Sequence, residues 1–291
     1  MCHRKPEIDM KKMICIGLLT AALVSCSHQE AKVMARFVPE RMDDFVWENE
    51  YVCYRAYGKA LEGNPTSPGF DVWVKTPGAL VANSRYEGYL REGDRYYHTD
   101  RGDGKDCYKV AVSLGAGASA PLVDGQLIYP ATNFRSWEIV DSSATSISFI
   151  LHYPAWEVNG VEVALDKKIT VESGSYFCKA EDCYTGDFDT LMIAAGIFTH
   201  DGWEDCYKGS DRFAIWEKAS DTSFEPEDGM IGVALHMPGA ESVIELEANR
   251  PHIVATRKVV PGEILSYSFG SCWSKGDIKD SSSWFEMLKA L

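Results

Sequence analysis

Short runs of apolar, β-branched and aromatic residues recur along most of the chain, with turn-forming residues between them. Val, Ile, Thr, Tyr, Phe and Trp are typical of strands, and Asn159-Gly160 and Ser173-Gly174 have the composition of tight turns. The pattern predicts an all-β chain of antiparallel strands, as in a sandwich or a larger β assembly. The runs extend over residues 51–57, 71–75, 146–152, 161–165, 168–172, 191–198, 230–235, 252–256 and 264–269.

Helix signals are scarce by comparison. The clearest lies at the C-terminal end, where Trp284, Leu288 and Leu291 recur at helical spacing behind Asp280. Aspartate is a favoured N-cap because its carboxylate accepts a hydrogen bond from the first turn. We therefore expect few helices and a short C-terminal helix.

Composition and charge narrow the classes of function. The chain has 291 residues, 45% of them hydrophobic, which is enough for a full core, and we expect a single domain over residues 35–291. The net charge of −14 argues against nucleic acid as a partner, because such binding uses Lys and Arg to neutralise phosphates. No glycine-rich nucleotide motif and no nucleophile-elbow motif occurs.

Residues 1–26 resemble an export signal. Lys11 and Lys12 precede the apolar run 13–24, which is too short to span a bilayer, and Leu-Val-Ser-Cys ending at Cys26 resembles a bacterial lipobox. The resemblance implies lipidation of Cys26, followed by a tether over residues 27–34. We expect an exported protein whose only membrane contact is this anchor, and the tether lacks the acidic run associated with surface export, which favours the periplasmic face of the outer membrane. An ordinary signal peptide with a chance cysteine is the alternative.

Six cysteines remain after the signal and lipobox are set aside. An even number permits disulfides in an exported protein, and Cys178 with Cys183 could close a hairpin. Several of the six lie in strand-like runs beside aromatic residues, where free cysteine behaves as a small buried hydrophobe. We predict that they are unpaired.

The densest polar segment is residues 94–110, with one His, four Asp, three Tyr and four Arg or Lys. Charged groups are rarely buried without partners, so the segment is either a solvated loop or a site for a polar ligand such as a sugar. His98 can exchange a proton near neutral pH. If residues 107–112 form a strand, Tyr108 and Lys109 face opposite sides, and we place Tyr108 in the site.

A second polar segment, residues 36–49, leads into the strand that carries Arg55. The guanidinium of Arg41 or Arg55 can fork onto a carboxylate, and the indole of Trp47 can stack on the apolar face of a sugar. The alternative is an edge-strand lattice of salt bridges with Trp47 in the core.

Several motifs together resemble one known family. They are the Arg-Phe-Val-Pro-Glu-Arg-x-Asp-Asp-x-x-Trp-Glu-Asn motif of residues 36–49, Asp-Val-Trp-Val-Lys at 71–75, Tyr-His-x-Asp at 97–100, Asp-Cys-Tyr at 106–108 and the late glycine-rich strand 229–235. Over about residues 35–290 the chain resembles domain of unknown function family 4861, found in bacterial polysaccharide-utilisation systems. The resemblance implies a galactose-mutarotase-like β-supersandwich. It also implies removal of water from a non-reducing-end uronic acid to leave a 4,5-unsaturated uronate.

This elimination needs a cation on the carboxylate, a base for the C5 proton and an acid for the departing hydroxyl. We assign His98 and Tyr108 as the catalytic pair, with Tyr97 as an alternative to Tyr108, and add His200, which follows an apolar strand. An acidic oligosaccharide is the expected partner, and no cofactor is expected. The predicted substrate-binding residues are Arg41, Trp47, Glu48, Arg55, Asp71, Trp73 and Asp100.

Other readings stay open. Asp100, Asp103 and Asp106 recur at every third position and could gather oxygen ligands for calcium, although they lack the spacing of an EF-hand loop and a solvated loop is favoured. A glycoside hydrolase or polysaccharide lyase acting on acidic oligosaccharides is one alternative, and the hydrolase needs two carboxylates across a cleft. A sugar-binding lipoprotein without catalysis is another. The oligomeric state is not determined by the sequence.

Overall fold

Three antiparallel sheets build the part of the chain described by the computed structural model, which covers residues 1, 31–63, 68–200, 202–221, 228–247 and 250–291. The predicted export signal, its lipidation site Cys26 and the first tether residues lie outside the described part. Residues Ala31–Leu291 form one unit. The first strand begins at Val33, inside the segment predicted as tether.

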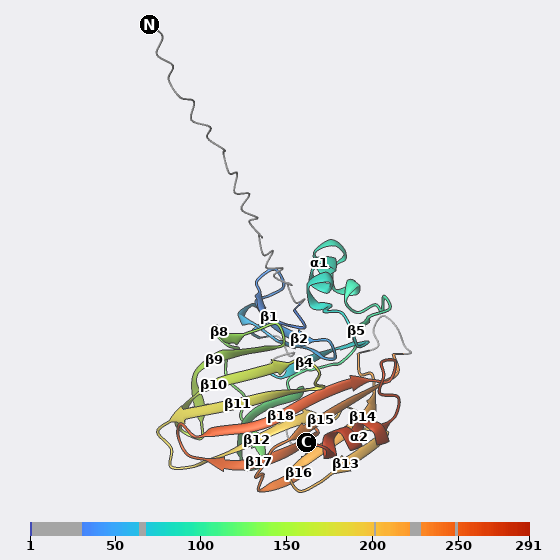
Figure 1. Cartoon of the computed structure of the whole chain (residues 1–291). Coiled ribbons are helices and arrows are strands. Elements are labelled where there is room, and N and C mark those ends of the chain that lie inside the picture. Colours follow the sequence, from blue (N-terminus) through green and yellow to red (C-terminus); the bar gives the residue numbers. More distant parts are fainter. Residues whose placement is uncertain (2–30, 64–67, 201, 222–227, 248–249) are drawn as a thin grey trace. The chain divides into compact units, whose positions relative to one another are not determined.

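The first sheet has the order β1-β2-β3-β4-β5, and the largest sheet has the order β13-β14-β15-β18-β11-β10-β9-β8. The third sheet has the order β16-β17-β12-β6-β7. Figure 1 shows the long strands β9, β10, β11 and β18 side by side in the largest sheet. The strands are β1 (Val33–Val38), β2 (Asp44–Asn49), β3 (Cys53–Ala56), β4 (Phe70–Lys75), β5 (Gly104–Asp106), β6 (Ala116–Val123), β7 (Gln126–Leu127), β8 (Ser136–Ser142), β9 (Ser146–Val158), β10 (Val161–Glu172), β11 (Phe177–Gly186), β12 (Leu191–Phe198), β13 (Asp205–Lys208), β14 (Arg212–Lys218), β15 (Met230–His236), β16 (Ser242–Leu246), β17 (His252–Val259) and β18 (Ile264–Trp273).

The predicted all-β supersandwich of antiparallel sheets with few helices is confirmed. Asn159 and Gly160 form the predicted turn between β9 and β10, both with positive φ. The runs 161–165 and 168–172, predicted as two strands, belong to the single strand β10. Residues 107–112, which were considered as a strand, do not form one, because β5 ends at Asp106.

The two α-helices differ in how their first turns are capped. Helix α2 (Ser281–Lys289) has the predicted cap, in which the carboxylate of Asp280 accepts a hydrogen bond from the backbone N–H of Ser283. Two short 3-10 turns cover Lys59–Leu61 and Asp94–Tyr96. Helix α1 (Ala82–Glu92) is absent from the prediction, because its sequence lacks an apolar stripe and no side chain of its own caps its first turn.

An apolar core fills the space between the sheets and also encloses one ion pair. The ammonium of Lys167 on β10 lies 2.5 Å from a carboxylate oxygen of Asp182 on β11 and 3.1 Å from the hydroxyls of Ser119 and Tyr267. Ser119 lies on β6, so this network joins the largest sheet to the third sheet. Burial lowers the pKa of Lys167, and its bonds to hydroxyl and carboxylate oxygens offset that cost.

Within the described residues, the structure contains no helix long and apolar enough to cross a membrane. The six cysteines of the described domain are unpaired, as predicted.

Candidate functional site

Charged side chains gather on one face of the first sheet. Arg55 on β3 lies directly opposite Asp71 on β4, and Trp73 on β4 lies opposite Asp106 on β5. Directly opposed residues share a face, and residues two apart on a strand share it as well. The opposite face of the same strands carries Trp47 and other apolar residues of the main core. The short strands therefore separate a polar face from an apolar one.

Arg55 is the centre of this polar face, and we call its group with Arg41, Asp44, Asp71 and Asp106 the Arg55 cluster. Its Nη2 donates to the carboxylate of Asp71 and, at 3.0 Å, to that of Asp106, while Nη1 lies 3.6 Å from Asp44. Each of these side chains is at most 3% exposed. Removing a charge from water costs free energy, and a charged partner in good geometry offsets that cost. The three carboxylates and the guanidinium must therefore be held in fixed positions relative to one another.

Aromatic rings enclose the two guanidinium groups. The guanidinium carbon of Arg55 lies 5.0 Å from the ring centroid of Tyr57 and 4.9 Å from that of Trp73. Arg41 contributes a second guanidinium, whose Nη1 donates to Asp44 at 3.2 Å and whose Nη2 donates to the hydroxyl of Tyr97 at 3.2 Å. The side chain of Arg41 is 11% exposed, so it lies at the rim of the cluster.

His98 lies at the same rim with a defined tautomer. Its Nδ1 is 2.9 Å from the backbone carbonyl of Asp106. A carbonyl only accepts hydrogen bonds, so Nδ1 carries the hydrogen and Nε2 is the basic nitrogen of the neutral ring. Nε2 lies 3.9 Å from the Asp106 carboxylate, and the side chain is 16% exposed. This carboxylate stabilises the imidazolium that forms when Nε2 takes up a proton.

Asp71 holds a proton more tightly than an ordinary carboxyl. Burial and the neighbouring charge of Asp106 raise its pKa to about 7, against the opposing effect of Arg55. Burial also raises the pKa of Asp44. The Arg55 cluster can therefore store a proton close to neutral pH.

The stability of the protein should reflect this carboxyl. An unfolded aspartate titrates at about 3.9, so between about pH 4 and pH 7 the folded state binds the additional proton. The free energy of unfolding should therefore fall as the pH rises through this window. Asp71→Asn should make the fall less steep, as measured by urea unfolding at a series of pH values.

Asp141→Asn is the matched control, because Asp141 is exposed on β8. It should keep the wild-type slope. A wild-type slope in Asp71→Asn would show that Asp71 is not the titrating group.

Three predicted substrate-binding residues are buried among protein contacts. Trp47 is fully buried and packs against Tyr54 and Phe70, so its face cannot stack on a sugar. Trp73 is 1% exposed beneath Arg55. Glu48 is buried and accepts hydrogen bonds at 2.8 Å from the first backbone N–H groups of α1, while its other contact is the ammonium of Lys75 at 3.2 Å. These carboxylate bonds complete the start of the helix, which explains why α1 forms there.

Tyr108, the predicted partner of His98, instead contacts Phe198 and His200. Its hydroxyl donates to the backbone carbonyl of Phe198 at 3.3 Å, and its ring meets that of His200 edge-on at 4.8 Å. Burial raises its pKa well above the usual range, so Tyr108 keeps its proton. Because residues 107–110 are not a strand, the alternation that separated Tyr108 from Lys109 does not apply, and both belong to the surroundings of His200.

His200 follows β12, as predicted, but both ring nitrogens are engaged. Nδ1 lies 2.8 Å from the carboxylate of Glu217, and Nε2 lies 2.6 Å from the backbone carbonyl of Lys109. Sequence reasoning missed Glu217, which is nearly fully buried on β14. A glutamate at the end of the apolar run Phe213–Trp216 was the available signal.

Asp100, Asp103 and Asp106 face different partners. Asp100 accepts from the backbone N–H groups of Gly102 and Gly104, Asp103 lies 3.7 Å from Arg85, and Asp106 binds Arg55. Asp100 therefore shapes its loop, and the structure does not bring it to the rim residues. Among the described residues, no group of three or more His, Cys, Asp or Glu side chains is placed to hold a metal ion.

The Arg55 cluster thus unites Arg41, Arg55, Asp71 and His98 from the predicted set. Sequence reasoning did not include Asp44 or Tyr57 among the substrate-binding residues. The signal was available, since Asp44 and Glu48 alternate with Trp47 on β2, which places Trp47 on the opposite face.

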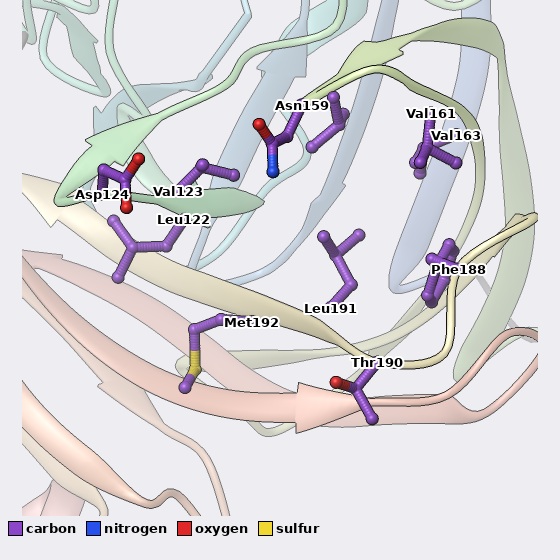
Figure 2. Close-up of a pocket in the computed structure, with 11 residues that line it drawn as sticks. Leu122, Val123, Asp124, Asn159, Val161, Val163, Phe188, Thr190, Leu191 and Met192 are labelled. Carbon is purple, nitrogen blue, oxygen red and sulfur yellow. The ribbon is translucent and has the colours of Figure 1, made fainter.

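A pocket of about 320 Å³ lies elsewhere, between the turns that end the sheets. Figure 2 shows Asp124, Asn159 and Phe188 among its lining residues. Asp124 is the one ionisable side chain among those that line it in the described part of the chain. This pocket therefore offers little acid–base chemistry.

The chain resembles known proteins both in sequence and in structure. It is 29% identical to Uncharacterized protein P7 of Formosa agariphila over 274 residues, 88% of this chain and 66% of that protein. The chain thus spans just under two thirds of that relative's length.

Among solved structures, it is 10% identical to a candidate kojibiose phosphorylase from the human microbiome, with a TM-score of 0.45 and coverage of 90% of this chain and 36% of that one. It is also 10% identical to the GH36 α-galactosidase AgaB of Geobacillus stearothermophilus, with a TM-score of 0.40. That match covers 83% of this chain and 41% of the other. Structural similarities this low carry no argument about activity. The family model named Domain of unknown function (DUF4861) matches residues 21–291, and the chain belongs to this family.

Proposed function

We propose that the protein is a carbohydrate-active enzyme that removes water from the non-reducing-end uronic acid of an oligosaccharide. The product would carry a 4,5-unsaturated uronate. The observation that carries this proposal is the tautomer of His98, which presents a basic Nε2 at the rim of a site containing two guanidinium groups. An exported, lipid-anchored enzyme of bacterial polysaccharide breakdown would meet such oligosaccharides after the polymer has been cut.

The reaction balances with these groups. The C5 proton of the uronate moves to Nε2 of His98. The electron pair of the broken C–H bond forms the C4=C5 double bond as the C4–O bond breaks, and the departing hydroxyl takes a proton to leave as water. A cation at the carboxylate makes the C5 proton more acidic, because it stabilises the negative charge that develops there.

Arg41 is better suited than Arg55 to neutralise the substrate carboxylate. Arg55 is buried among three carboxylates that already balance its charge. Arg41 reaches the rim and is paired with Asp44, which it shares with Arg55. We therefore assign the substrate carboxylate to Arg41 and treat Arg55 as the residue that positions the carboxylates of the cluster.

Tyr97 takes the role of acid that Tyr108 cannot fill. Its hydroxyl accepts from Nη2 of Arg41 at 3.2 Å and donates to Asp94 at 2.5 Å. Burial raises the pKa of Tyr97, and the guanidinium groups of Arg55 and Arg41 act in the opposite direction, so they favour release of the phenolic proton as charge develops on the departing oxygen. Tyr97 is 2% exposed, and its ring lies 4.8 Å from that of His98, so the acid adjoins the base on the buried side of the rim.

Elimination fits this arrangement better than glycoside hydrolysis. A hydrolase places two carboxylates on either side of the bond to be cut. Here Asp44, Asp71 and Asp106 all converge on one buried guanidinium. Of the other acids predicted to bind substrate, Glu48 accepts hydrogen bonds at the start of α1 and Asp100 holds its own loop.

The test is incubation of the mature protein with oligosaccharides that end in glucuronic acid, followed by mass spectrometry and ultraviolet absorbance. Loss of one water with a new conjugated double bond and unchanged chain length supports the proposal. Shortening with the same absorbance would indicate a lyase, and shortening without it a hydrolase. Binding without any change would indicate a sugar-binding protein. Each of these three outcomes contradicts dehydration.

A further inference from the structure

A second pocket of about 320 Å³ lies where the first sheet meets the edge of the largest sheet, and its volume is within the range of small-molecule sites. One side is formed by β8, the edge strand of the largest sheet (Figure 1). The other sides come from β1, the turn between β1 and β2, and the 3-10 turn that follows β3. We call it the Trp137 pocket, and its lining residues include Phe37, Asp43, Lys59, Arg135 and Trp137.

Trp137 gives this pocket an accessible indole. Its ring stacks on that of Phe37 with the centroids 5.9 Å apart, and it lies 5.6 Å from the ring of Phe45. These contacts with β1 and β2 hold the indole in place, while Trp137 remains 41% exposed. An indole fixed in this way can stack on the apolar face of a pyranose without losing further side-chain freedom when the sugar binds.

Two cationic side chains of the pocket have donors available. Lys59 is exposed, and its ammonium forms no ion pair with the described residues. Arg135 is 34% exposed, and its Nη1 donates to the carboxylate of Glu62 and, at 3.1 Å, to the carbonyl of Asn133. Its Nε and Nη2 have no hydrogen-bond partner in the part of the chain that the structure describes. A guanidinium carries five N–H donors, so Arg135 can bind a sugar hydroxyl and keep Glu62.

Asp43 adds an acceptor, and close backbone packing places it beside Lys59. The backbone of Asp43 has a φ of 62°, which is uncommon for a residue with a side chain. A Cβ at Gly58 would lie 1.7 Å from the carbonyl oxygen of Asp43, so only glycine allows the two segments to approach this closely. The amide of Asn133 donates to the carbonyl of Gly58 at 2.8 Å, which fastens the segment before β8 to the same place.

The same two segments also border the Arg55 cluster. Asp44, next to Asp43, accepts from Arg41, and the ring of Tyr57, just before Gly58, lies 5.0 Å from the guanidinium carbon of Arg55. Arg41 and Asp43 are two residues apart, so their Cα atoms are at most about 7 Å from each other. A sugar joined to a uronate at Arg41 therefore has the Trp137 pocket within reach.

We propose that the Trp137 pocket binds the neutral pyranose joined to the terminal uronic acid, with Trp137 as the stacking surface, Lys59 and Arg135 as hydroxyl donors and Asp43 as the hydroxyl acceptor. The inference rests on the proposed function, which places the uronate beside Arg41. The two cations of the pocket are balanced by Asp43 and Glu62, which suits uncharged hydroxyls. The protein should therefore prefer a uronate that is still attached to a second sugar.

The test compares methyl β-D-glucuronide with disaccharides in which glucuronic acid is linked to D-xylose, D-galactose or D-mannose. Dissociation constants are measured by isothermal titration in a His98→Gln background, where turnover is slowed. At least one disaccharide should bind about tenfold more tightly than the methyl glycoside. Trp137→Ala should weaken binding of that disaccharide about tenfold, and Lys59→Met about threefold, which removes most of the preference.

Ile139→Ala and Lys179→Met are the matched controls. Ile139 is 39% exposed on the same strand as Trp137, and Lys179 is 53% exposed on β11, so neither change should alter the affinity. Thermal unfolding of each variant separates lost binding from lost folding. Lys59→Met changes an exposed side chain and therefore still tests the pocket if Trp137→Ala unfolds.

The proposal is overturned if no disaccharide binds, if none binds more tightly than the methyl glycoside, or if both pocket variants keep the original affinity. Failure of the proposed function has a different signature. In that case no double bond forms with the wild type, although disaccharide binding still depends on Trp137. Dehydration of the disaccharide with an unchanged KM in both pocket variants would instead remove the pocket alone.

Discussion

Arg55→Met is expected to lower the free energy of unfolding by about 3–5 kcal/mol, the range for removing one partner from a buried ion pair. Methionine can fill much of the space of the arginine stem, but it leaves Asp44, Asp71 and Asp106 without their shared cation. All three are at most 3% exposed, so water cannot replace the guanidinium. The loss should be largest at alkaline pH, where all three carboxylates are ionised. Urea unfolding with a two-state fit measures it.

Arg36→Met provides the comparison for this experiment. The guanidinium of Arg36 lies 2.8 Å from Glu40, and both side chains are about one-third exposed. Ion pairs of this kind contribute roughly 0–1 kcal/mol, so this variant should be close to wild type. Arg55→Lys should fall between the two, because lysine restores the charge without the two-pronged geometry. A loss in Arg55→Met no larger than in Arg36→Met would mean that the buried carboxylates are not charged in the folded protein.

His98→Gln is expected to lower kcat for dehydration by roughly 100-fold or more, the range for losing a general base. Glutamine can still donate from its amide to the carbonyl of Asp106, so the local fold should persist. It has no basic nitrogen to accept the C5 proton. The measurement is the initial rate of double-bond formation over a range of pH.

The appropriate control is His152→Gln. His152 lies on β9, where it pairs with Asp166 at 2.7 Å and is about one-third exposed. This variant should keep wild-type kcat. Full activity in His98→Gln would remove His98 from the mechanism while leaving the existence of the reaction unchallenged.

Much of the β architecture could be predicted from the sequence because strand signals are local. The run Leu191–Phe198 is β12 to the residue, and Asn159-Gly160 forms the expected turn. The C-terminal helix was also predictable, because Asp280 is a cap within four residues of the apolar positions it serves. Helix α1 was not, because the carboxylate that completes its first turn belongs to Glu48, far away in the sequence.

The candidate site, like the fold, could be predicted only in part. Motif resemblance located Arg41, Arg55, Asp71 and His98, and the structure places them together around one guanidinium. The same reasoning placed Trp47 and Tyr108 with them, although they belong elsewhere. Trp47 lies on the other face of its strand, and Tyr108 follows a strand that ends too early for alternation to apply.

The sequence by itself determined the all-β class, the turn and cap positions, the family and the presence of two polar segments, because each depends on neighbouring residues or on motif identity. Only the tertiary structure decided which of those polar residues meet. Strand pairing brings Arg55 against Asp71 and Asp106, and chain folding brings His200 against Glu217 and Lys109. Burial then raises the pKa of Asp71, and a backbone carbonyl sets the tautomer of His98. These are contacts between distant segments, and no local pattern specifies them.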